Sequence, residues 1–447
     1  MKIRLGALAL LFGSAGLGWR AGSSPRVGRV VRLWTAASLA YTAVLAWRGG
    51  DAMRAARRAV GPRAPSWRTG ERPFVTLMVP ARDEAAVIAD VVRDLGGQRY
   101  ARDGRPNFEV IVIDDGSTDG TADLARKAAH GALGPVRVVQ RPNGTGPALR
   151  GAALNFATPL SSGEVIAALD ADARVGPDYV ESAIRAWERD PAAAGLQTQK
   201  RPVNSEASWL TRAQLEELLL DMSSQCGRLA AGGSGELRGN GMFIRRDVLD
   251  RVGGWGNDAL TEDLDMSTRL VAAGERVAVA PEVAVGEQAV ESVPPLWHQR
   301  MRWAEGSLRR SIAHAGGVIR GPAPVVTKLD ALAFLITESV VPPFVAATFV
   351  AYAVRRPRGR SEDWRLPAAI AAGYTGAPAL LAWSGLAADG TSGSRLLAGS
   401  LRAAFFLTHW LVVVPAALAR LAFGPTRIRY VKTPRVAPLE QHGPPEG

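Results

Sequence analysis

The sequence predicts an α/β protein in which a mostly parallel sheet, covered by helices, is flanked by apolar helices that enter a membrane. Short β-like runs alternate with helix-like stretches through the middle of the chain, and acidic residues follow several of these runs directly. Apolar segments with few charged residues stand at both ends. Alternating strands and helices are typical of βαβ units, which build a parallel sheet covered on both faces.

The middle of the chain supplies the predicted sheet. Pro147 and Pro177 stand where two of its helices are predicted to begin, a position at which proline is tolerated. The β-like runs are 75–79, 110–113, 136–139, 165–169 and 196–199, and the helix-like stretches between them are 85–95, 121–130, 147–157 and 177–188.

The apolar end segments predict membrane helices, because about 20 apolar residues span a bilayer. The alternative is a set of core helices in a soluble protein. Clustering at both chain ends, with Trp and Arg at several flanks, favours the membrane. Segments 5–19, 33–47, 366–388 and 403–419 contain no Asp, Glu, Lys or Arg, and 331–354 contains only Glu338.

Proline and basic residues predict how these segments are oriented. Pro342 and Pro343 would break segment 331–354 into halves too short to span, so we expect a re-entrant or interfacial segment there. The basic stretches 355–365 and 427–435 then both face the cytoplasm. Lys2 and Arg4 before the first apolar segment also fit a signal peptide, which would move the middle of the chain away from cytosolic nucleotides. We therefore expect a multi-pass protein of the inner or plasma membrane with a cytoplasmic central domain.

Composition excludes several classes of protein. The 447 residues include 54 Lys+Arg and 42 Asp+Glu, but the arginines are spread along the chain without a nucleic-acid-binding motif, so we expect no nucleic-acid partner. A single cysteine, Cys226, excludes a disulfide framework and a cysteine-only zinc site. Neither G-x-G-x-x-G nor a P-loop follows a predicted strand, which argues against dehydrogenase and ATPase chemistry.

Acidic residues follow three of the predicted strands at their carboxyl ends, where open α/β sheets bind ligands. Asp170 and Asp172 are two residues apart on an extended segment, so both can point towards one ligand. Carboxylates suit Mg²⁺ or Mn²⁺, which take further ligands from water and phosphate oxygens. Asx-type turns and helix caps are the simpler explanation for each acid alone. The residues after these strands are Pro80 and Glu84, Asp114 and Asp115, and Asp170 and Asp172.

Two motifs follow the predicted sheet. Thr261 resembles a helix N-cap, with Glu262 and Asp263 in the first turn, which needs no chemistry to explain it. Residues 298–306 form a basic amphipathic stretch before the C-terminal apolar segments, and an interfacial helix would account for them too.

In order and spacing, four motifs resemble the membrane-integrated family 2 glycosyltransferases, which include cellulose, chitin and hyaluronan synthases and ceramide glucosyltransferase-like enzymes. The resemblance covers roughly residues 74–303 and the flanking membrane segments. It implies a GT-A-type nucleotide-sugar-binding domain and a metal-dependent, inverting transfer from a nucleotide donor such as a UDP-sugar, with Mg²⁺ or Mn²⁺. The motifs are Asp114-Asp115-Gly-Ser, Asp170-Ala-Asp172, Thr261-Glu-Asp263 and Gln299-Arg-Met-Arg-Trp303.

The resemblance also implies a division into regions. These are the N-terminal membrane segments 1–50, the GT-A catalytic domain 70–290, an interfacial amphipathic region 291–330 with the Gln299–Trp303 motif, transmembrane or re-entrant segments 331–424, and a basic, Pro-rich tail 425–447.

Site roles come from the same resemblance. Asp263 would be the general base, with Glu262 beside it in the catalytic set. Many relatives carry a Gly-Lys pair before an Ala-Leu-Asn stretch, whereas this chain has Arg150. The remaining roles are nucleotide binding by Pro80, Glu84, Asp114, Asp115 and Asp170, metal binding by Asp172 with Asp170, and acceptor or diphosphate contacts by Gln299, Arg302 and Trp303.

The acceptor stays open between two classes. The Gln299–Trp303 motif is commonest in processive enzymes, so we expect a growing polysaccharide as acceptor. The alternative is a lipid glycosyltransferase that adds one or a few sugars to a membrane lipid, which the small membrane block favours. A third hypothesis is a non-catalytic membrane scaffold, and intact motifs argue against it. The expected partners are a nucleotide-sugar donor, a carbohydrate or lipid acceptor, the lipid bilayer and an accessory membrane subunit.

Overall fold

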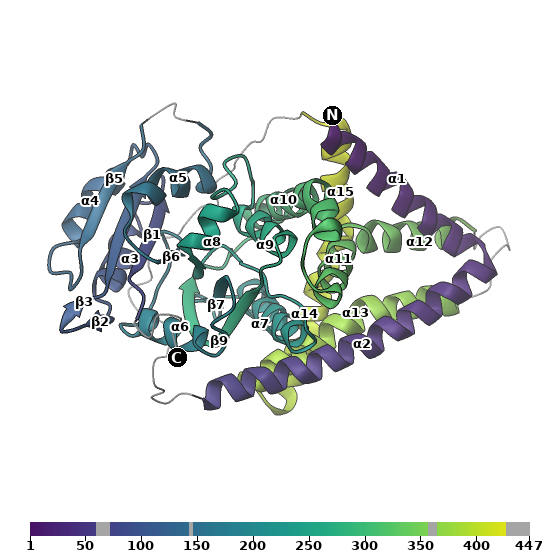
Figure 1. The fold of residues 1–447 in the computed structure, drawn as a ribbon. Helices are drawn as coiled ribbons and strands as arrows, with labels where there is room; N and C mark the ends of the chain where they lie inside the picture. Colours follow the sequence, from purple (N-terminus) through teal and green to yellow (C-terminus); the bar gives the residue numbers. More distant parts are fainter. Residues whose placement is uncertain (60–71, 143–145, 356–363, 426–447) are drawn as a thin grey trace.

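The computed structural model describes residues 1–59, 72–142, 146–355 and 364–425. The middle of the chain forms a sheet covered by helices, and the two ends of the chain come together as a separate group of long helices (Figure 1). Helices from the centre of the chain lie between these two parts.

The sheet has seven strands in the order β5-β4-β1-β6-β8-β7-β9. Strand β1 pairs in parallel with β4 and β6, β4 with β5, and β7 with β9, while β8 is antiparallel to both of its neighbours. The predicted class, a mostly parallel sheet covered by helices, is therefore confirmed. The strands are β1 (Val75–Ala81), β4 (Phe108–Asp114), β5 (Val136–Gln140), β6 (Val165–Ala168), β7 (Gly195–Pro202), β8 (Met242–Arg245) and β9 (Val277–Glu287), and β2 (Ala101–Arg102) with β3 (Arg105–Pro106) forms a separate pair.

Five of the seven strands of the main sheet lie where the sequence predicts them, whereas β8 and β9 were not predicted. With only four residues, β8 is too short to show a period of two, and it is buried on both faces between two other strands. In β9, Pro281 and a register shift in its pairing with β7 interrupt the pattern.

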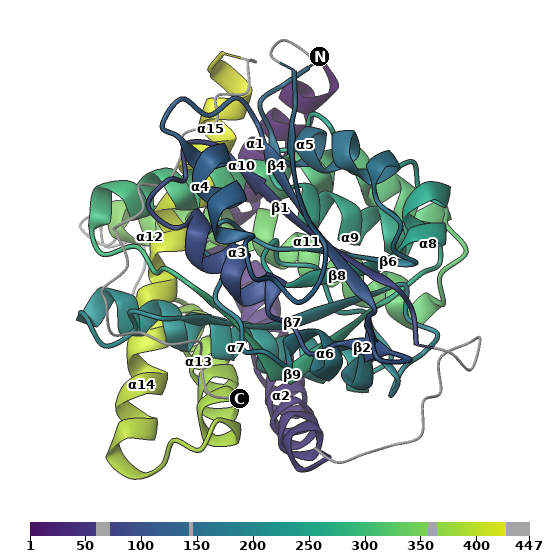
Figure 2. The ribbon, with the colours of Figure 1, turned by 90° about the vertical axis from the view of Figure 1, so that its left-hand side faces the viewer.

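Alternate residues of the strands point into two separate cores. Leu77 and Val79 of β1 pack with helices α3, α4 and α6, whereas Met78 packs with α5, α8 and α9. Figure 2 shows α3 and α4 on one side of the strands and α5, α8 and α9 on the other. These helices are α3 (Ile88–Gly96), α4 (Thr121–Ala128), α5 (Arg150–Ala157), α6 (Tyr179–Trp187), α8 (Arg246–Arg251) and α9 (Glu262–Ala272).

The predicted starts of two helices were wrong. Helix α5 begins at Arg150 and α6 at Tyr179, so Pro147 and Pro177 lie in the preceding turns rather than at the first helical position. The backbone carbonyl of Pro147 instead accepts a hydrogen bond from Arg141, at 2.9 Å.

The two chain ends form paired long helices. Helix α1 (Lys2–Ser23) packs along α12 (Val341–Arg355), and α2 (Pro25–Arg58) packs along α13 (Arg365–Ala388). In Figure 1 the two pairs diverge from the turn between α1 and α2, and we call these two helix pairs the arms. Helix α15 (Trp410–Phe423), which follows α14 (Gly393–Phe406), also contacts α1 and α12.

Within the described residues, three helical stretches are long and apolar enough to cross a membrane: α2, α13 and the stretch Gly393–Phe423. Helices α11 (Val325–Ser339) and α12 form a fourth candidate only as a pair bent by 44°. The bend lies beside Pro342 and Pro343, so the predicted break in segment 331–354 is present. Helix α1 is not among the candidates, so the prediction of a crossing at 5–19 has no support. The predicted basic tail after residue 425 lies outside the described residues.

Helices α7 (Trp209–Ala230), α10 (Val293–Arg320) and α11 lie between the sheet and the arms. Helix α7 contacts β7 on one side and both α2 and α13 on the other. The α2–α7 contact is close because both helices carry glycine there. A Cβ on Gly49 would lie 2.1 Å from the backbone oxygen of Ser223, and one on Gly227 would lie 2.3 Å from that of Leu45.

Candidate active site

A cavity of about 1260 Å³ extends from the carboxyl ends of the sheet to the apolar arms. All of the predicted site residues line it except Asp114 and Asp172. Residues of the middle helices line its central part, and residues of the long terminal helices α2, α12 and α13 line its far end. The lining residues at the sheet end include Pro80, Glu84, Asp115, Arg150 and Asp170, and those at the far end include Trp34, Leu39, Phe344, Ile370, Tyr374 and Ala377.

The register of the parallel strands brings the first acids together. Ala81 of β1 pairs with Asp114 of β4, so the residues after both strands reach the same edge. Asp115 lines the cavity and receives a 2.6 Å hydrogen bond from Nε of the buried Arg141. The backbone N–H of Glu84 donates to the Thr121 hydroxyl at 2.8 Å, which fixes the loop that carries Glu84 against the start of α4.

Asp114 does not reach the cavity. It is 2 % exposed, its Oδ1 accepts the Ser117 backbone N–H at 3.1 Å, and its Oδ2 accepts from Gln140 at 3.2 Å. This is an Asx-type arrangement that stabilises the turn after β4. Because both of its carboxylate oxygens bond within the protein, Asp114 is not placed for the direct nucleotide contact that was predicted. Its side chain holds the loop on which Asp115 stands.

The two acids after β6 have different surroundings. Asp170 lines the cavity, and its backbone N–H donates to Asn240 at 3.1 Å. Asp172 is buried behind it and accepts the backbone N–H of Gln288 at 3.0 Å. A third acid, Glu287 at the end of β9, lines the cavity and pairs with Lys200 at 3.2 Å. Burial raises the pKa of Glu287, and the nearby Asp172 and Asp170 add to the rise against the opposing effect of Lys200.

These acids have the right donor chemistry for a hard divalent cation. Asp170, Asp172 and Glu287 offer carboxylate oxygens, and Mg²⁺ or Mn²⁺ commonly completes its shell with water and substrate phosphates. No cluster of three or more His, Cys, Asp or Glu side chains is already arranged as a metal site within the described residues. The residues therefore fit a cation that arrives with a diphosphate better than one held by protein ligands alone.

Arg150 joins the strand-end acids to helix α9. Its Nη2 lies 3.1 Å from Oδ1 of Asp170 and donates to the backbone oxygen of Gly239 at 3.0 Å, while its Nη1 bonds to Glu262. Burial raises the pKa of Glu262 and the adjacent Asp263 adds to the rise, while Arg150 opposes both. Sequence analysis noted Arg150 only as a departure from the resemblance, and the structure gives it a central position.

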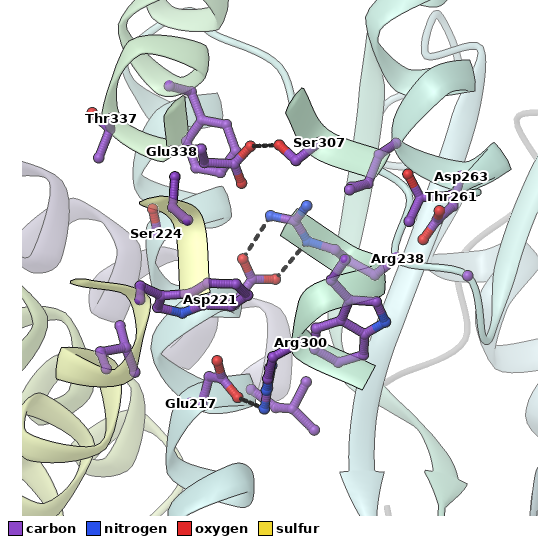
Figure 3. A pocket seen from close by; sticks show the side chains of 18 of the residues that line it. Glu217, Asp221, Ser224, Arg238, Thr261, Asp263, Arg300, Ser307, Thr337 and Glu338 are labelled. Atoms are coloured by element: carbon purple, nitrogen blue, oxygen red, sulfur yellow. Dashed lines mark hydrogen bonds and ion pairs between the residues drawn. The ribbon is translucent and has the colours of Figure 1, made fainter. Parts of the chain in front are cut away.

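Asp263 stands in the first turn of α9, half-buried, and faces the cavity (Figure 3). Gly239 lies beside it with φ +81°, and a Cβ at this glycine would come within 3.2 Å of the Asp263 carboxylate. Of the two predicted acids in this turn, Glu262 bonds to Arg150, so Asp263 is the one available to a substrate hydroxyl.

The Gln299–Trp303 motif begins almost two turns into α10, and Gln299, Arg302 and Trp303 line the cavity. Arg300, between the predicted residues, is 2 % exposed and pairs with Glu217 of α7. Its guanidinium carbon lies 4.3 Å from the centre of the Trp303 ring, and Lys200 Nζ lies 5.7 Å from it. Cations thus already contact the ring that was expected to meet the acceptor.

Beyond Asp263, charged and hydroxyl side chains of the middle helices, together with Arg238 from the loop after α7, line the cavity, and we call them the polar belt (Figure 3). Arg238 bonds to Asp221 at 2.7 and 3.0 Å, and Arg228 bonds to Asp330 at 2.9 Å. Glu338 accepts from the Ser307 hydroxyl at 2.5 Å. The polar belt comprises Glu217, Asp221, Ser224, Arg228, Arg238, Arg300, Ser307, Asp330, Thr337 and Glu338.

The polar belt and most of the cations of the site were not predicted from the sequence. Lys200 directly follows the predicted strand 196–199, so the rule that located the acids could have found it. Arg300 stands inside a recognised motif but was not assigned a role. The α7 acids Glu217 and Asp221 had no signal, because a carboxylate on an amphipathic helix normally faces water.

Comparisons with known proteins agree with this geometry. A sequence model described as glycosyltransferase-like family 2 matches residues 72–306. A beta-monoglucosyldiacylglycerol synthase of Trichormus variabilis is 33 % identical over 370 residues, covering 81 % of this chain and 77 % of that protein. A poly-beta-1,6-N-acetyl-D-glucosamine synthase of Staphylococcus aureus is 26 % identical over 243 residues, covering 54 % of this chain and 56 % of that protein.

Among solved structures, a mannosyltransferase from Pyrobaculum calidifontis in complex with GDP-Man and Mn²⁺ has the same fold, with a TM-score of 0.58. The match covers 94 % of this chain and 99 % of that one at 21 % sequence identity. The similarity therefore includes the helical ends as well as the sheet.

Proposed function

Because the chain belongs to glycosyltransferase family 2, and is therefore an enzyme rather than a scaffold, we propose that it transfers a sugar from a nucleotide donor to a hydroxyl of a membrane lipid. The supporting observation is the single cavity that joins the strand-end acids and Asp263 to apolar membrane helices. The acceptor hydroxyl would reach Asp263 from one end while its acyl chains stay at the other.

The lipid alternative has better support than the polysaccharide acceptor expected from the sequence. The relative with the broader and higher similarity is a beta-monoglucosyldiacylglycerol synthase, and the polysaccharide synthase matches only about half of this chain. The far end of the cavity is lined by side chains such as Leu39, Phe344 and Ile370. Apolar side chains favour acyl chains, whereas an extended polysaccharide needs hydrogen-bonding groups along its path. We propose a diacylglycerol-type acceptor and a hexose such as glucose.

The donor would lie at the sheet end of the cavity. Pro80, Glu84 and Asp115 would contact the nucleoside, with Asp170 beside the ribose. Asp172 with Asp170 would hold Mg²⁺ or Mn²⁺, which would stabilise the negative charge of the leaving diphosphate. Arg302 lines the same cavity and would add positive charge on the acceptor side of that diphosphate.

The reaction is a direct displacement at the anomeric carbon. Asp263 accepts the proton of the attacking hydroxyl as the bond between its oxygen and the anomeric carbon forms. The bond from that carbon to the diphosphate oxygen breaks, and the nucleoside diphosphate leaves with the electron pair. One base and one displacement invert the configuration, so an α-linked donor gives a β-linked lipid. We propose that this happens on the cytoplasmic side of a multi-pass protein.

A donor and acceptor panel tests the proposal. Purified full-length protein in lipid nanodiscs would receive UDP- and GDP-sugars, with diacylglycerol as acceptor and Mn²⁺ or Mg²⁺ present. We expect one donor to give a glycosylated lipid that is soluble in organic solvent and identified by mass spectrometry. A large water-soluble product on gel filtration would instead favour polysaccharide synthesis and contradict the lipid proposal.

A further inference from the structure

We propose that the polar belt is a charge filter that admits the uncharged headgroup of a neutral lipid and rejects anionic lipids. This inference rests on the proposed lipid acceptor and adds the chemical class of headgroup together with the residues that select it. Its starting point is the position of the belt, on helices α7, α10 and α11 and on the loop after α7 that carries Arg238, between the sheet and the arms.

A phosphate entering this region would meet cations that already have carboxylate partners. Asp330 holds Arg228 through Nε at 2.9 Å and Nη2 at 2.9 Å. Asp221 holds Arg238 at 2.7 Å, and Arg300 pairs with Glu217. A lipid phosphate that bonded to one of these arginines would bring its negative charge beside the carboxylate that already neutralises the guanidinium, in largely buried surroundings, which is unfavourable.

The charge balance of the belt points the same way. Four carboxylates, on Glu217, Asp221, Asp330 and Glu338, face three guanidinium groups, on Arg228, Arg238 and Arg300. Outside the cavity lining, Arg310 bonds to Glu338 at 2.7 Å and to Glu236 at 2.9 Å. Counting Arg310 and Glu236 as well still leaves one more carboxylate than guanidinium groups. Arg302 also lines the cavity and offsets this excess, so an anionic headgroup would enter a region with no net positive charge to attract it.

Neutral polar groups, in contrast, find donors and acceptors there. Nη1 of Arg228, and Nε and Nη1 of Arg300, are buried donors with no hydrogen-bond partner among the described residues. Oε1 of Gln299 is a buried acceptor in the same state. Arg228 and Arg300 are 3 % and 2 % exposed and line the cavity. Ester carbonyls can accept from the arginines, so a glycerol ester satisfies these donors without disturbing an ion pair, and its one hydroxyl remains for Asp263.

Two lipids with the same acyl chains test the filter. Dioleoylglycerol is neutral, and dioleoylphosphatidylglycerol also carries free hydroxyls but adds one phosphate charge. The full-length protein in detergent micelles would bind a fluorescent diacylglycerol, and each lipid would compete for it. We expect phosphatidylglycerol to compete at least about tenfold more weakly. Equal competition by the two lipids would overturn the proposal.

Variants connect the selectivity to the belt. Asp221→Asn keeps the shape of the side chain but removes a negative charge beside Arg238, so we expect the gap between the two lipids to shrink several-fold. Asp330→Asn, which frees Arg228, is a second variant with the same expected direction. Asp247→Asn alters an exposed ion pair with Arg251 outside the cavity and should leave the gap unchanged. An undiminished gap in both belt variants would contradict the filter.

Binding and turnover separate this proposal from the one it rests on. If diacylglycerol displaces the probe but no donor gives a glycolipid, the proposed transfer fails while the filter is supported by the competition data. If both lipids are glycosylated at equal rates, the proposed function stands and the filter is wrong.

Discussion

Arg150 is the first residue of α5, and its Nη2 lies 3.1 Å from Oδ1 of Asp170, an acid that follows strand β6. The same guanidinium bonds to Glu262 in the first turn of α9. One side chain therefore connects the expected donor end of the cavity with the turn that carries the proposed base. A movement of Asp170 on donor binding would therefore shift Arg150 and change its ion pair with Glu262.

Arg150→Met should lower kcat more than it raises the KM for the lipid. Each charge-assisted hydrogen bond contributes about 1.5–3 kcal/mol, which corresponds to about tenfold to 100-fold in rate if it is needed in the transition state. Arg150→Lys keeps the charge without the planar fork and should recover part of the rate. Steady-state kinetics with both substrates varied would measure this.

Arg126→Met is the matched control for Arg150, because Arg126 forms an exposed ion pair on α4 outside the cavity. It should leave both kinetic constants unchanged. A double-mutant cycle with Glu262→Gln measures the link directly. If the two effects add without coupling, Arg150 does not act through Glu262.

Asp263→Asn should lower kcat by about 10²–10⁴-fold, because the amide cannot accept the proton of the acceptor hydroxyl. Binding of the nucleotide should persist, since the donor residues stand on other elements. Calorimetry with the nucleoside diphosphate and turnover with the lipid would separate the two effects. Normal turnover in this variant would assign the base to another group, and Glu262→Gln would then be the next variant to measure.

The sequence predicted the strand-end acids well, because parallel strands force their carboxyl ends to one edge of a sheet. It placed Asp114 in the site wrongly, since an Asp after a strand can equally stabilise a turn, and only the hydrogen bonds to Ser117 and Gln140 decide between these roles. The polar belt could not be predicted, because Glu217 and Arg300 come from helices far apart in the chain, and their contact follows from tertiary packing.

Removal of divalent cations should abolish transfer. Asp170 and Asp172 supply carboxylates at one edge of the sheet, and a leaving diphosphate needs positive charge beside it. Chelation with EDTA should stop turnover, and added Mn²⁺ or Mg²⁺ should restore it. Asp172→Asn should raise the metal concentration needed for half-maximal rate, while Asp247→Asn on the exposed surface should not. Undiminished transfer in EDTA would contradict the proposed metal role.

Ala377 of α13 lines the far end of the cavity, so a large side chain there should shorten the acyl chain that fits. Each methylene kept from apolar contact costs about 0.8 kcal/mol, so displacement of two methylenes would weaken a long-chain acceptor by about tenfold or more. Ala377→Trp should therefore raise the KM for dioleoylglycerol strongly and that for dioctanoylglycerol little. The exposed Ala372 of the same helix does not line the cavity, and Ala372→Trp is the matched control. A uniform change in KM for both chain lengths in Ala377→Trp would show that acyl chains do not occupy this end, and the acceptor would have to reach Asp263 by another path.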